Sequence, residues 1–301
     1  MSTKSILVLG AGQLGSFVIQ ALLKHPAHRD TSIAVLLRQS SDPNKQQLVS
    51  SLQSQNVSVV FGDLVSSTTA ELSHLFSPFH TIIGCMGLAA GKGIQIKIAH
   101  AVLDAGLPRY FPWQFGVDYD IIGRGSPQDL FDEQLDVRDV LRAQKKTEWV
   151  IVSTGLFTNF LFLQPFGVVD TNEGVVRALG AWGNRITVTG ADDIGRLTAE
   201  IVFSEPRTKD EIVYVAGDTV SYKEVADIVE EILGKPVQRE VWTLDQLQDE
   251  LKGDPNDMLK KYRLMFAEGK GVSWDMEKTF NARKGIEVQD VKKWAQANLS
   301  K

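Results

Sequence analysis

The stretch Ser5-Ile6-Leu7-Val8-Leu9-Gly10-Ala11-Gly12-Gln13-Leu14-Gly15 lies near the start of the chain and decides its fold. An apolar run typical of a buried strand enters a turn with three glycines, and a helical pattern leaves it. In a nucleotide-binding βαβ unit the first Gly permits the tight turn. The second lets a pyrophosphate approach the backbone, and the third lets helix and strand pack closely. The start of the helix then offers free N–H groups and a positive dipole end to the phosphates. We therefore expect a dinucleotide site formed by Gly10, Gly12, Gln13, Leu14 and Gly15. A turn whose glycines serve packing alone is the alternative.

The second predicted strand indicates which dinucleotide is bound. The strand Ser32–Leu37 ends at Arg38, and no carboxylate occurs between Ile33 and Ser41. A site for NADH usually has Asp or Glu here for the ribose 2′-OH, whereas an Arg would meet a 2′-phosphate. Lys45 follows within reach, so we expect NADPH as the cofactor. A solvated loop cation at Arg38 and a polar turn over Asp42–Lys45 are the alternatives.

Composition narrows the class of protein. The chain has 301 residues, of which 43% are hydrophobic and 23% charged, and this is ordinary for a globular protein. A net charge of −5 argues against a nucleic-acid partner. Cys85 is the single cysteine, and no histidine has a zinc-like partner pattern, so we expect neither a disulfide framework nor a metal site. No apolar stretch reaches the length of a membrane span and no signal peptide is evident, so a cytoplasmic protein without a membrane partner is expected.

The first half of the sequence alternates strand and helix patterns. Expected strands cover Ser5–Leu9, Ser32–Leu37, Val57–Phe61, His80–Cys85, Arg109–Pro112 and Trp149–Ser153. Expected helices cover Leu14–Lys24, Lys45–Gln55, Ser67–Phe76, Ile94–Ala105 and Leu130–Gln144. Short strands that are apolar on both faces are typical of a parallel sheet covered by helices. Right-handed crossovers then give an α/β fold with a doubly wound, mainly parallel Rossmann sheet.

The second half of the sequence has a different pattern of strands and helices and predicts a smaller α/β substrate lobe. We expect short strands over Ile186–Thr189, Ile212–Val215 and Pro236–Trp242, and helices over Ala191–Phe203, Ser221–Leu233, Thr243–Lys252, Asn256–Glu268 and Val288–Leu299. Ser221 and Glu224 form a capping-box pattern, and Gly234 is a typical helix stop. The expected division is a cofactor domain over residues 1–155 and a lobe over 156–301, with some segments returning to the main sheet.

Candidate site residues follow the predicted strand ends. Asp63 follows the third strand, where it would either accept from adenine or form a turn. Met86 and Gly87 follow the fourth strand, where small residues would let the cofactor lie against the backbone. Cys85 beside them is interpreted as a buried small hydrophobe.

Two aromatic segments suggest a pocket for a small-molecule substrate. Bulky and polar groups gather in Phe111–Asp120, at the end of the fifth strand, and core packing does not explain them all. The sixth strand ends similarly in Ser153–Phe160, whose phenylalanines would be either pocket walls or core. The expected pocket residues are Trp113, Gln114, Phe115, Phe157 and Phe160.

The glycine turn, Arg38 and the segment Phe111–Asp118 together resemble the NmrA-like, isoflavone-reductase-like branch of atypical short-chain dehydrogenases/reductases. The stretches Leu130–Asp132, Val137-Arg138 and Ser153–Phe157 carry the same resemblance, which covers nearly the whole chain and is specific mainly up to about Phe160. It implies a Rossmann NADPH-binding domain, a smaller substrate domain, and reduction of aromatic or conjugated secondary metabolites. By that resemblance the pyrophosphate and 2′-phosphate would be held by Gly10, Gly12, Gly15, Arg38 and Lys45, and the nicotinamide would be flanked by Met86, Gly87, Thr154, Leu156 and Phe157.

The chain departs from this family where the chemistry would occur. Plant-type members carry a Lys on the helix after the fifth strand, and Gln134 stands at that position. An amide can hydrogen-bond, but it cannot donate a proton as a lysine acid does. Trp113 replaces the usual Ser of the fifth-strand motif, and Tyr119 lacks the Lys of a Tyr-x-x-x-Lys dyad. Gln134 and Tyr119 are therefore the candidate catalytic residues.

Three functions are compatible with these residues. The first is an NADPH-dependent reductase whose conjugated substrate gives a delocalised anion that water or Tyr119 could protonate. Losing one general acid costs roughly 100- to 10,000-fold in rate, which a reactive substrate tolerates. The second is a non-redox enzyme on the same scaffold. The third is a redox-sensing regulator that binds NADP(H) without turnover. Neither the substrate nor the oligomeric state follows from the sequence.

Overall fold

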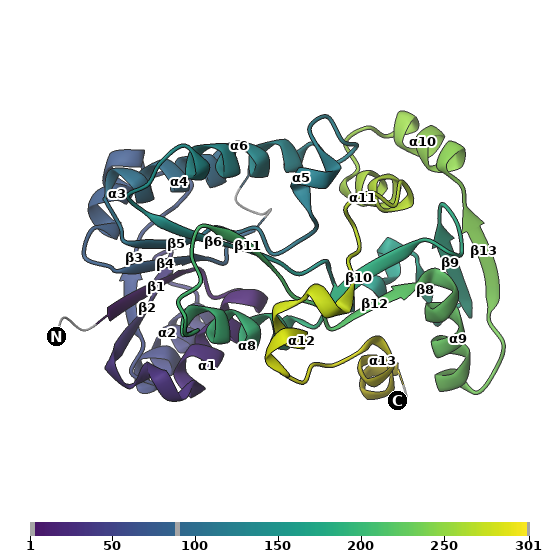
Figure 1. Cartoon of the computed structure of the whole chain (residues 1–301), viewed down its shortest axis with the longest axis horizontal. Helices are drawn as coiled ribbons and strands as arrows, with labels where there is room; N and C mark the ends of the chain where they lie inside the picture. Colours follow the sequence, from purple (N-terminus) through teal and green to yellow (C-terminus); the bar gives the residue numbers. More distant parts are fainter. Residues whose placement is uncertain (1–3, 88–90, 300–301) are drawn as a thin grey trace. The chain divides into compact units, whose positions relative to one another are not determined.

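The chain divides into two compact units, which are interleaved along the sequence (Figure 1). The computed structural model describes residues 4–87 and 91–299. Unit 1 comprises Met1–Gln114, Glu133–Val152 and Ile194–Ile212. Unit 2 comprises Phe115–Asp132, Ser153–Asp193 and Val213–Lys301.

Unit 1 is built on a seven-stranded sheet with the order β11-β6-β5-β4-β1-β2-β3. Its strands are β1 (Lys4–Leu9), β2 (Thr31–Leu37), β3 (Ser58–Phe61), β4 (Thr81–Gly84), β5 (Arg109–Phe111), β6 (Glu148–Ser153) and β11 (Glu211–Tyr214). Neighbouring strands from β3 to β6 pair in parallel. The order changes direction at β1, whose neighbours are β2 and β4, so the carboxyl end of β1 is the switch point where such sheets bind ligands.

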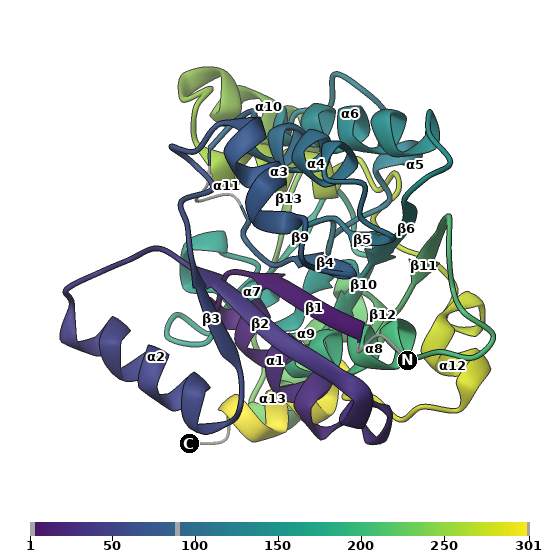
Figure 2. The same ribbon diagram turned by 90° about the vertical axis from the view of Figure 1, so that its left-hand side faces the viewer.

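Helices cover both faces of this sheet. They are α1 (Gln13–Lys24), α2 (Pro43–Ser54), α3 (Thr69–Phe76), α4 (Ile94–Asp104), α6 (Leu130–Arg142) and α8 (Ala191–Val202), with a short 3-10 helix η1 (Pro26–Asp30). Figures 1 and 2 show α3, α4 and α6 on one face and α1 and α8 on the other. Fully buried side chains from the strands, such as Leu7 and Ile82, pack against Val102 of α4 and Leu141 of α6. The α/β class with a doubly wound sheet is thus confirmed.

Unit 2 contains two three-stranded sheets. One has the order β12-β10-β7, and the other has the order β13-β9-β8. Each sheet combines one parallel and one antiparallel pair. The strands are β7 (Leu156–Phe157), β8 (Val169–Asp170), β9 (Val175–Leu179), β10 (Arg185–Thr189), β12 (Asp218–Ser221) and β13 (Gln238–Trp242).

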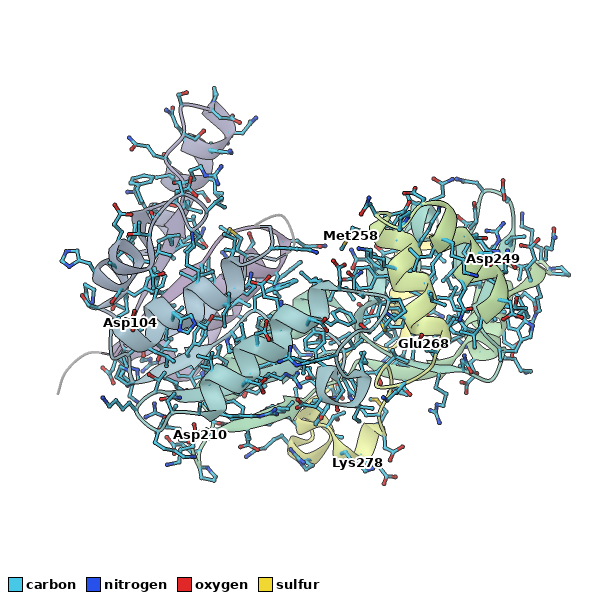
Figure 3. All side chains as sticks on the ribbon, turned by 90° about the horizontal axis from the view of Figure 1, so that it is seen from above. Asp104, Asp210, Asp249, Met258, Glu268 and Lys278 are labelled. Carbon is cyan, nitrogen blue, oxygen red and sulfur yellow. The ribbon has the colours of Figure 1, made fainter. Side chains whose placement is uncertain are left out.

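The remaining helices of unit 2 are mostly short. They are α5 (Tyr119–Ile122), α7 (Thr158–Leu161), α9 (Tyr222–Leu233), α10 (Leu244–Gly253), α11 (Met258–Ala267), α12 (Phe280–Lys284) and α13 (Val291–Leu299), with 3-10 helices η3 (Gln164–Phe166) and η4 (Met276–Lys278). Figure 3 shows α11, with Met258 near one end and Glu268 near the other, beside α10, which carries Asp249. Over residues 4–87 and 91–299, no helix is both long and apolar enough to cross a membrane.

Capping residues explain where the helices differ from the sequence predictions. The polar turn considered for Asp42–Lys45 is wrong, because Asp42 accepts from the Asn44 N–H and starts α2 at Pro43. Lys45 therefore lies in the first turn of α2. Helix α3 starts later than predicted because Thr68 and Glu71 form a capping box. The capping box of Ser221 with Glu224 and the stop at Gly234, which has φ +64°, are confirmed.

The sequence reading missed several short strands. β7, β8, β9 and β12 had no expected counterpart, and β7 and β8 contain only two residues each. A two-residue strand carries no readable period, because its pairing is decided by the neighbouring strand. The strand expected at Ile212–Val215 is observed as β11, which lies beside β6 in the main sheet. The Val215 N–H donates to the Ser153 carbonyl at 2.9 Å just beyond this pair.

Helices α1 and α8 approach each other through their backbones. A β-carbon at Gly195 of α8 would lie 2.6 Å from the carbonyl carbon of Phe17 in α1. That distance is shorter than any ordinary contact, and a backbone atom cannot rotate away. Gly195 is therefore required for the contact between the two helices on this face of the sheet.

Substituting Gly195→Ala should lower the free energy of unfolding by about 1–3 kcal/mol, because the methyl group overpacks a backbone contact. Gly253→Ala is the matched control, since a β-carbon there meets nothing within 4 Å. The control should be neutral or slightly stabilising, because Ala favours helix over Gly. Chemical denaturation of the two variants measures the difference. Equal stabilities would show that the helices can separate without cost.

Candidate cofactor and active site

The glycine turn after β1 is held by two steric requirements. Gly10 has φ +96°, a backbone conformation that side chains rarely permit. A β-carbon at Gly15 would lie 2.1 Å from the Gly10 carbonyl oxygen and 3.3 Å from the Cβ of Cys85. Helix α1 can therefore begin directly against the turn only if position 15 is glycine.

Gly12 has a different reason to be glycine. Its φ of −71° suits any residue, and a β-carbon there would meet nothing within 4 Å. Gly12 is also the N-cap of α1, with no side-chain cap and no acidic residue in the first turn of the helix. The start of α1 thus offers backbone N–H groups and a positive dipole end to an outside anion. Within α1, the side chain of Leu14 is buried in the core, so only its backbone could serve a ligand.

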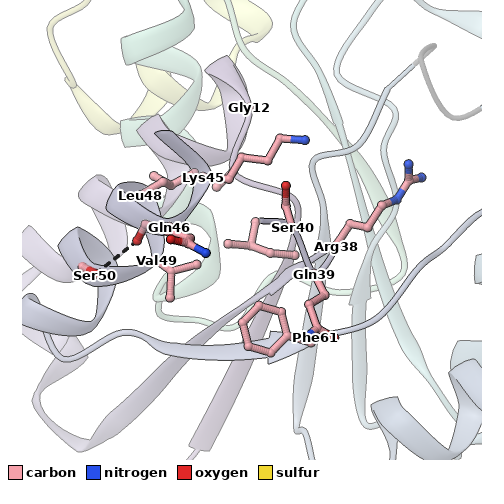
Figure 4. Close-up of a pocket in the computed structure, with 12 residues that line it drawn as sticks. Gly12, Arg38, Gln39, Ser40, Lys45, Gln46, Leu48, Val49, Ser50 and Phe61 are labelled. Carbon is pink, nitrogen blue, oxygen red and sulfur yellow. Dashed lines mark hydrogen bonds between the residues drawn. The ribbon is translucent and has the colours of Figure 1, made fainter. Parts of the chain in front are cut away.

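A pocket of about 500 Å³ opens beside this turn (Figure 4). Its lining residues come from the glycine turn, the end of β2, the first turns of α2 and the end of β3. They are Ala11, Gly12, Leu37, Arg38, Gln39, Ser40, Lys45, Gln46, Leu48, Val49, Ser50 and Phe61. The pocket thus brings together Gly12, Arg38 and Lys45, three residues chosen from the sequence. Among the described lining residues two are cations and none is a carboxylate.

Arg38 is held by a carboxylate that lies outside the pocket lining. Its Nη2 and Nε each lie 3.1 Å from an oxygen of Asp63, so the pair is bidentate. Asp63 also accepts from the Val65 N–H at 2.8 Å. This backbone bond, more than Arg38, holds the pKa of Asp63 below its usual range. The carboxylate is therefore ionised at neutral pH and orients the guanidinium, whose other donors stay available. The turn suggested for Asp63 is observed, and the expected contact with adenine stays a prediction.

Phe61 is a residue of this pocket that the sequence reading missed. It ends β3, and it is 50% exposed although it is a large apolar side chain. A flat apolar ring at the rim of a polar pocket is suited to covering by an aromatic base. The position of Phe61 directly before Gly62-Asp63, at a strand end, could have indicated a pocket residue. An aromatic residue at that position also fits the core of a strand, so the sequence did not distinguish the two.

The segments after β4 and β5 pack on each other. A β-carbon at Gly84 would lie 2.8 Å from the Trp113 N atom, and one at Gly87 would lie 2.6 Å from the Trp113 indole. Trp113 itself thus requires both glycines, of which Gly87 was predicted to lie beside the cofactor. The Met86 carbonyl accepts from Gln95 Nε2 at 2.8 Å, which fixes the strand end. Burial raises the pKa of the Cys85 thiol, as expected of a small buried hydrophobe.

Glu133 and Gln134 are neighbours on α6 with opposite surroundings. The carboxylate of Glu133 accepts from the N–H groups of Gly93 and Gln95, each at 2.8 Å, and so caps the start of α4. Gln134 is fully buried, yet neither its amide nitrogen nor its amide oxygen has a hydrogen-bond partner among the residues that the structure describes. A buried amide without partners costs a protein several kcal/mol in an apolar environment, so such groups usually serve a ligand or water.

The backbone around Gln134 is rigidly placed. The amide nitrogen of Gln114 donates to the Gln134 carbonyl at 2.8 Å, and the amide oxygen of Gln114 accepts from Arg138 Nε at 2.7 Å. All three residues are fully buried. Gln114, predicted as a pocket residue, thus ties the end of β5 to α6 and fixes where the Gln134 side chain starts.

The other predicted site residues lie in unit 2. The N–H groups of Thr154 and Gly155 donate to the Gly116 carbonyl at 2.9 and 3.0 Å, which joins the segments after β5 and β6. Leu156 and Phe157 form β7 and pair with β10. The hydroxyl of Tyr119 lies against Gly116, where a β-carbon would come within 2.5 Å of it. Tyr119 is buried, as is Phe115.

Phe160 belongs to an aromatic cluster of unit 2. Its ring lies 4.8 Å from that of Phe166 and 5.9 Å from that of Tyr262, measured between centroids. The Tyr119 ring packs on Phe131 at 4.8 Å, and Phe131 contacts Tyr262 at 6.0 Å. Phe160 and Tyr119, one from each of the two aromatic segments, therefore belong to one continuous packed set. Their contact with a substrate stays a prediction.

Comparison with known proteins places this chain in a family. The model of the NmrA-like family matches residues 2–292. An NmrA-like family domain-containing oxidoreductase of Gibberella moniliformis is 48% identical over 296 residues, which covers 96% of each chain. Eugenol synthase 1 of Petunia hybrida is 27% identical and covers 96% of this chain and 95% of its own length. The binary complex of leucoanthocyanidin reductase from Vitis vinifera with NADPH has a TM-score of 0.81 at 18% identity, covering 99% of this chain and 100% of that one.

The chain belongs to the NmrA-like family. The family predicted from the glycine turn, Arg38 and the segments after β5 and β6 is thus confirmed, as is the fold class.

The two steric roles within the glycine turn can be separated by a matched pair of variants. Gly12→Ala should fold like the wild type, because its methyl group enters open space. It should nevertheless weaken NADP⁺ binding about 10-fold or more, because a pyrophosphate would approach through that space. Gly15→Ala should instead destabilise the fold, because its β-carbon meets the Gly10 carbonyl. Thermal melting and calorimetric titration with NADP⁺ measure the two effects. An unaltered affinity in Gly12→Ala would place the pyrophosphate elsewhere.

Proposed function

We propose that this protein is an NADPH-dependent reductase that acts on an aromatic or conjugated small molecule. The observation that carries the proposal is the pocket beside the glycine turn. The uncapped start of α1 opens next to this pocket, Arg38 and Lys45 line it, and no described lining residue is a carboxylate. A dianionic 2′-phosphate fits this charge pattern, because it would give Lys45 and the remaining Arg38 donors an anion, which the ribose hydroxyls of NADH do not provide.

The relatives support the reaction class and its substrates. The relative from Gibberella moniliformis is named an oxidoreductase, and the structurally similar leucoanthocyanidin reductase binds NADPH. Eugenol synthase is named for an aromatic product. Aromatic side chains of unit 2, the buried Phe131 and the partly buried Phe160 and Tyr262, have the chemistry to pack against a planar substrate.

Bound NADPH would supply a hydride to an electrophilic carbon of the substrate, leaving NADP⁺ and a substrate anion that must take up one proton. Gln134 can donate an amide N–H to the substrate oxygen on which negative charge develops, but it has no proton to give up. The proton must then come from water or from Tyr119. This arrangement favours substrates such as enones or quinones, in which the anion is delocalised and weakly basic.

Arg38→Glu should raise the KM for NADPH roughly 10- to 100-fold and leave that for NADH nearly unchanged, because a charge-assisted bond to the 2′-phosphate becomes a repulsion. Arg29→Glu is the control, since it makes the same charge change in unit 1 away from the pocket lining. Steady-state kinetics with both cofactors measure the preference. An unchanged ratio in Arg38→Glu would refute the assignment of the 2′-phosphate.

Gln134→Met should stabilise the protein and lower its activity. A thioether of similar shape removes two unpartnered buried polar atoms, so the free energy of unfolding should rise by about 1–2 kcal/mol. The same change should lower kcat/KM roughly 10-fold or more, because the bond to the developing oxyanion is lost. The affinity for NADPH should not change.

Gln95→Met is the control for both effects of Gln134→Met. Gln95 is also buried, but its amide donates to the Met86 carbonyl, so its replacement should destabilise the protein by about 1 kcal/mol. Denaturation and NADPH oxidation with a panel of enones, quinones and aromatic ketones provide the measurements. A Gln134→Met variant of full activity would exclude Gln134 from the reaction. NADPH binding without turnover across the panel would favour the redox-sensing regulator.

A further inference from the structure

A second cavity of about 500 Å³ lies at the opposite edge of the main sheet from the glycine turn. Its lining includes Lys4, Thr31, Thr81 and Arg109, which are the first residues of β1, β2, β4 and β5. The cavity therefore opens at the amino ends of the parallel strands, whereas the proposed cofactor pocket lies at their carboxyl ends. Sheets of this type bind their nucleotides at the carboxyl ends, so the nucleotide site does not explain this cavity.

Basic side chains converge on this cavity from separate elements. Lys4 comes from β1, His80 precedes β4, Arg109 starts β5, and Arg207 follows α8. Within the described part of the chain, the Lys4 ammonium has neither an ion-pair nor a hydrogen-bond partner. The ring of His80 uses one nitrogen, Nδ1, on Thr81 Oγ1 at 2.8 Å. The Lys4 ammonium and the second ring nitrogen of His80 thus have no partner among the described residues.

Arg109 brings a buried charge whose partners are neutral. Its guanidinium donates to the carbonyls of Val202 at 2.7 Å and Thr208 at 2.8 Å, and its Nε has no partner. Burial lowers the pKa of Arg109 to about 10, which still leaves it protonated at neutral pH. Arg109 therefore tethers the end of α8 and also adds a positive charge that no contacting carboxylate cancels.

Among the described residues, one carboxylate near the cavity forms a contact ion pair with a basic side chain of the lining. Glu148 pairs with Arg207 at 2.7 Å. Asp30 and Glu205 also line the cavity, but both are exposed, and neither forms an ion pair with the described basic groups. An anion would therefore be attracted to the Lys4, His80 and Arg109 side of the cavity and repelled from the exposed carboxylates.

We propose that this cavity binds a doubly charged phosphate or sulfate group carried on a small apolar body. Lys4, His80 and Arg207 would contact the anion, and the apolar part would lie against Ile6, Val202 and Phe203, which complete the wall. Cations that can each reach a tetrahedral oxyanion are the usual way proteins hold such groups. The cavity is much larger than a bare oxyanion, which favours an organic ester over the inorganic ion.

His80 provides a local readout of occupancy. Burial, together with Arg207, Lys4 and Arg109, lowers the pKa of the imidazole, while Glu148 opposes them. A bound dianion stabilises the imidazolium and must raise that pKa. Sulfate is the appropriate first probe, because it keeps its double charge throughout the titration of a histidine.

The experiment is an NMR titration of the histidine ring signals in sodium sulfate and in sodium chloride of equal ionic strength. The His80 signals are assigned from their loss in His80→Gln. Sulfate should raise the pKa of His80 by about 0.5–1 unit relative to chloride and leave the other four histidines unmoved. A uniform shift of all five histidines, or no difference between the salts, would overturn the proposal.

Lys4→Gln tests the geometry without disturbing the core, because the Lys4 side chain is exposed and has no partner among the described residues. It should weaken sulfate binding roughly 2- to 5-fold, whereas Lys235→Gln, an equal charge change in unit 2, should not. Equal binding in Lys4→Gln and wild type would contradict the assigned site.

Phenyl phosphate should bind more tightly than sulfate if the apolar wall takes part, and equal affinities would overturn that part of the proposal. Because His80 reports on this cavity alone, the outcome does not depend on the proposed cofactor site.

Discussion

The contact between the Gly10 carbonyl and Gly15 is the constraint on which the nucleotide end of this protein depends. With a β-carbon excluded at position 15, α1 begins directly against the end of β1, and its first N–H groups face the same space as Ala11 and Gly12. The same helix meets α8 backbone to backbone at Gly195. Two glycines far apart in the sequence thus fix α1 at its start and along its length. A shift of α1 would move its first N–H groups away from Arg38 and Lys45. Neither the N–H groups nor the two cations would then be enough to bind the dinucleotide.

Most of unit 1 could be predicted from the sequence because its signals are local. The apolar strands, the glycine turn and the helix periods each lie within a few neighbouring residues, and the strands from β1 to β6 follow them closely. Unit 2 was harder, because strands such as β7 and β8 are defined by pairing with distant partners. The same limit applied to the site. Arg38 and Lys45 could be chosen from their positions after β2, but the ion pair with Asp63 and the exposed ring of Phe61 depend on the fold.

Glu133 and Gln134 show how differently one helix can use adjacent polar residues. Both carboxylate oxygens of Glu133 accept from backbone N–H groups at the start of α4, so this side chain stabilises the fold. Gln134 is buried with its amide unsatisfied, which is unfavourable for the unliganded protein. Sequence alone could not separate them, since both are polar residues of the same helix, and only the partners of each side chain reveal the difference.

The pocket residues that we propose to discriminate between cofactors occupy a short and exposed part of the chain. Arg38, Ser40 and Lys45 lie between the end of β2 and the first turn of α2, and the Arg38 side chain is 63% exposed. None of them belongs to the buried core of the sheet. Their replacement therefore leaves the packing of β1, β2 and α1 intact, so under the proposed assignment a few substitutions would alter cofactor choice on the same scaffold. With this assignment, the redox pool from which the protein draws its electrons would be an evolvable trait, separable from the fold that holds the nucleotide.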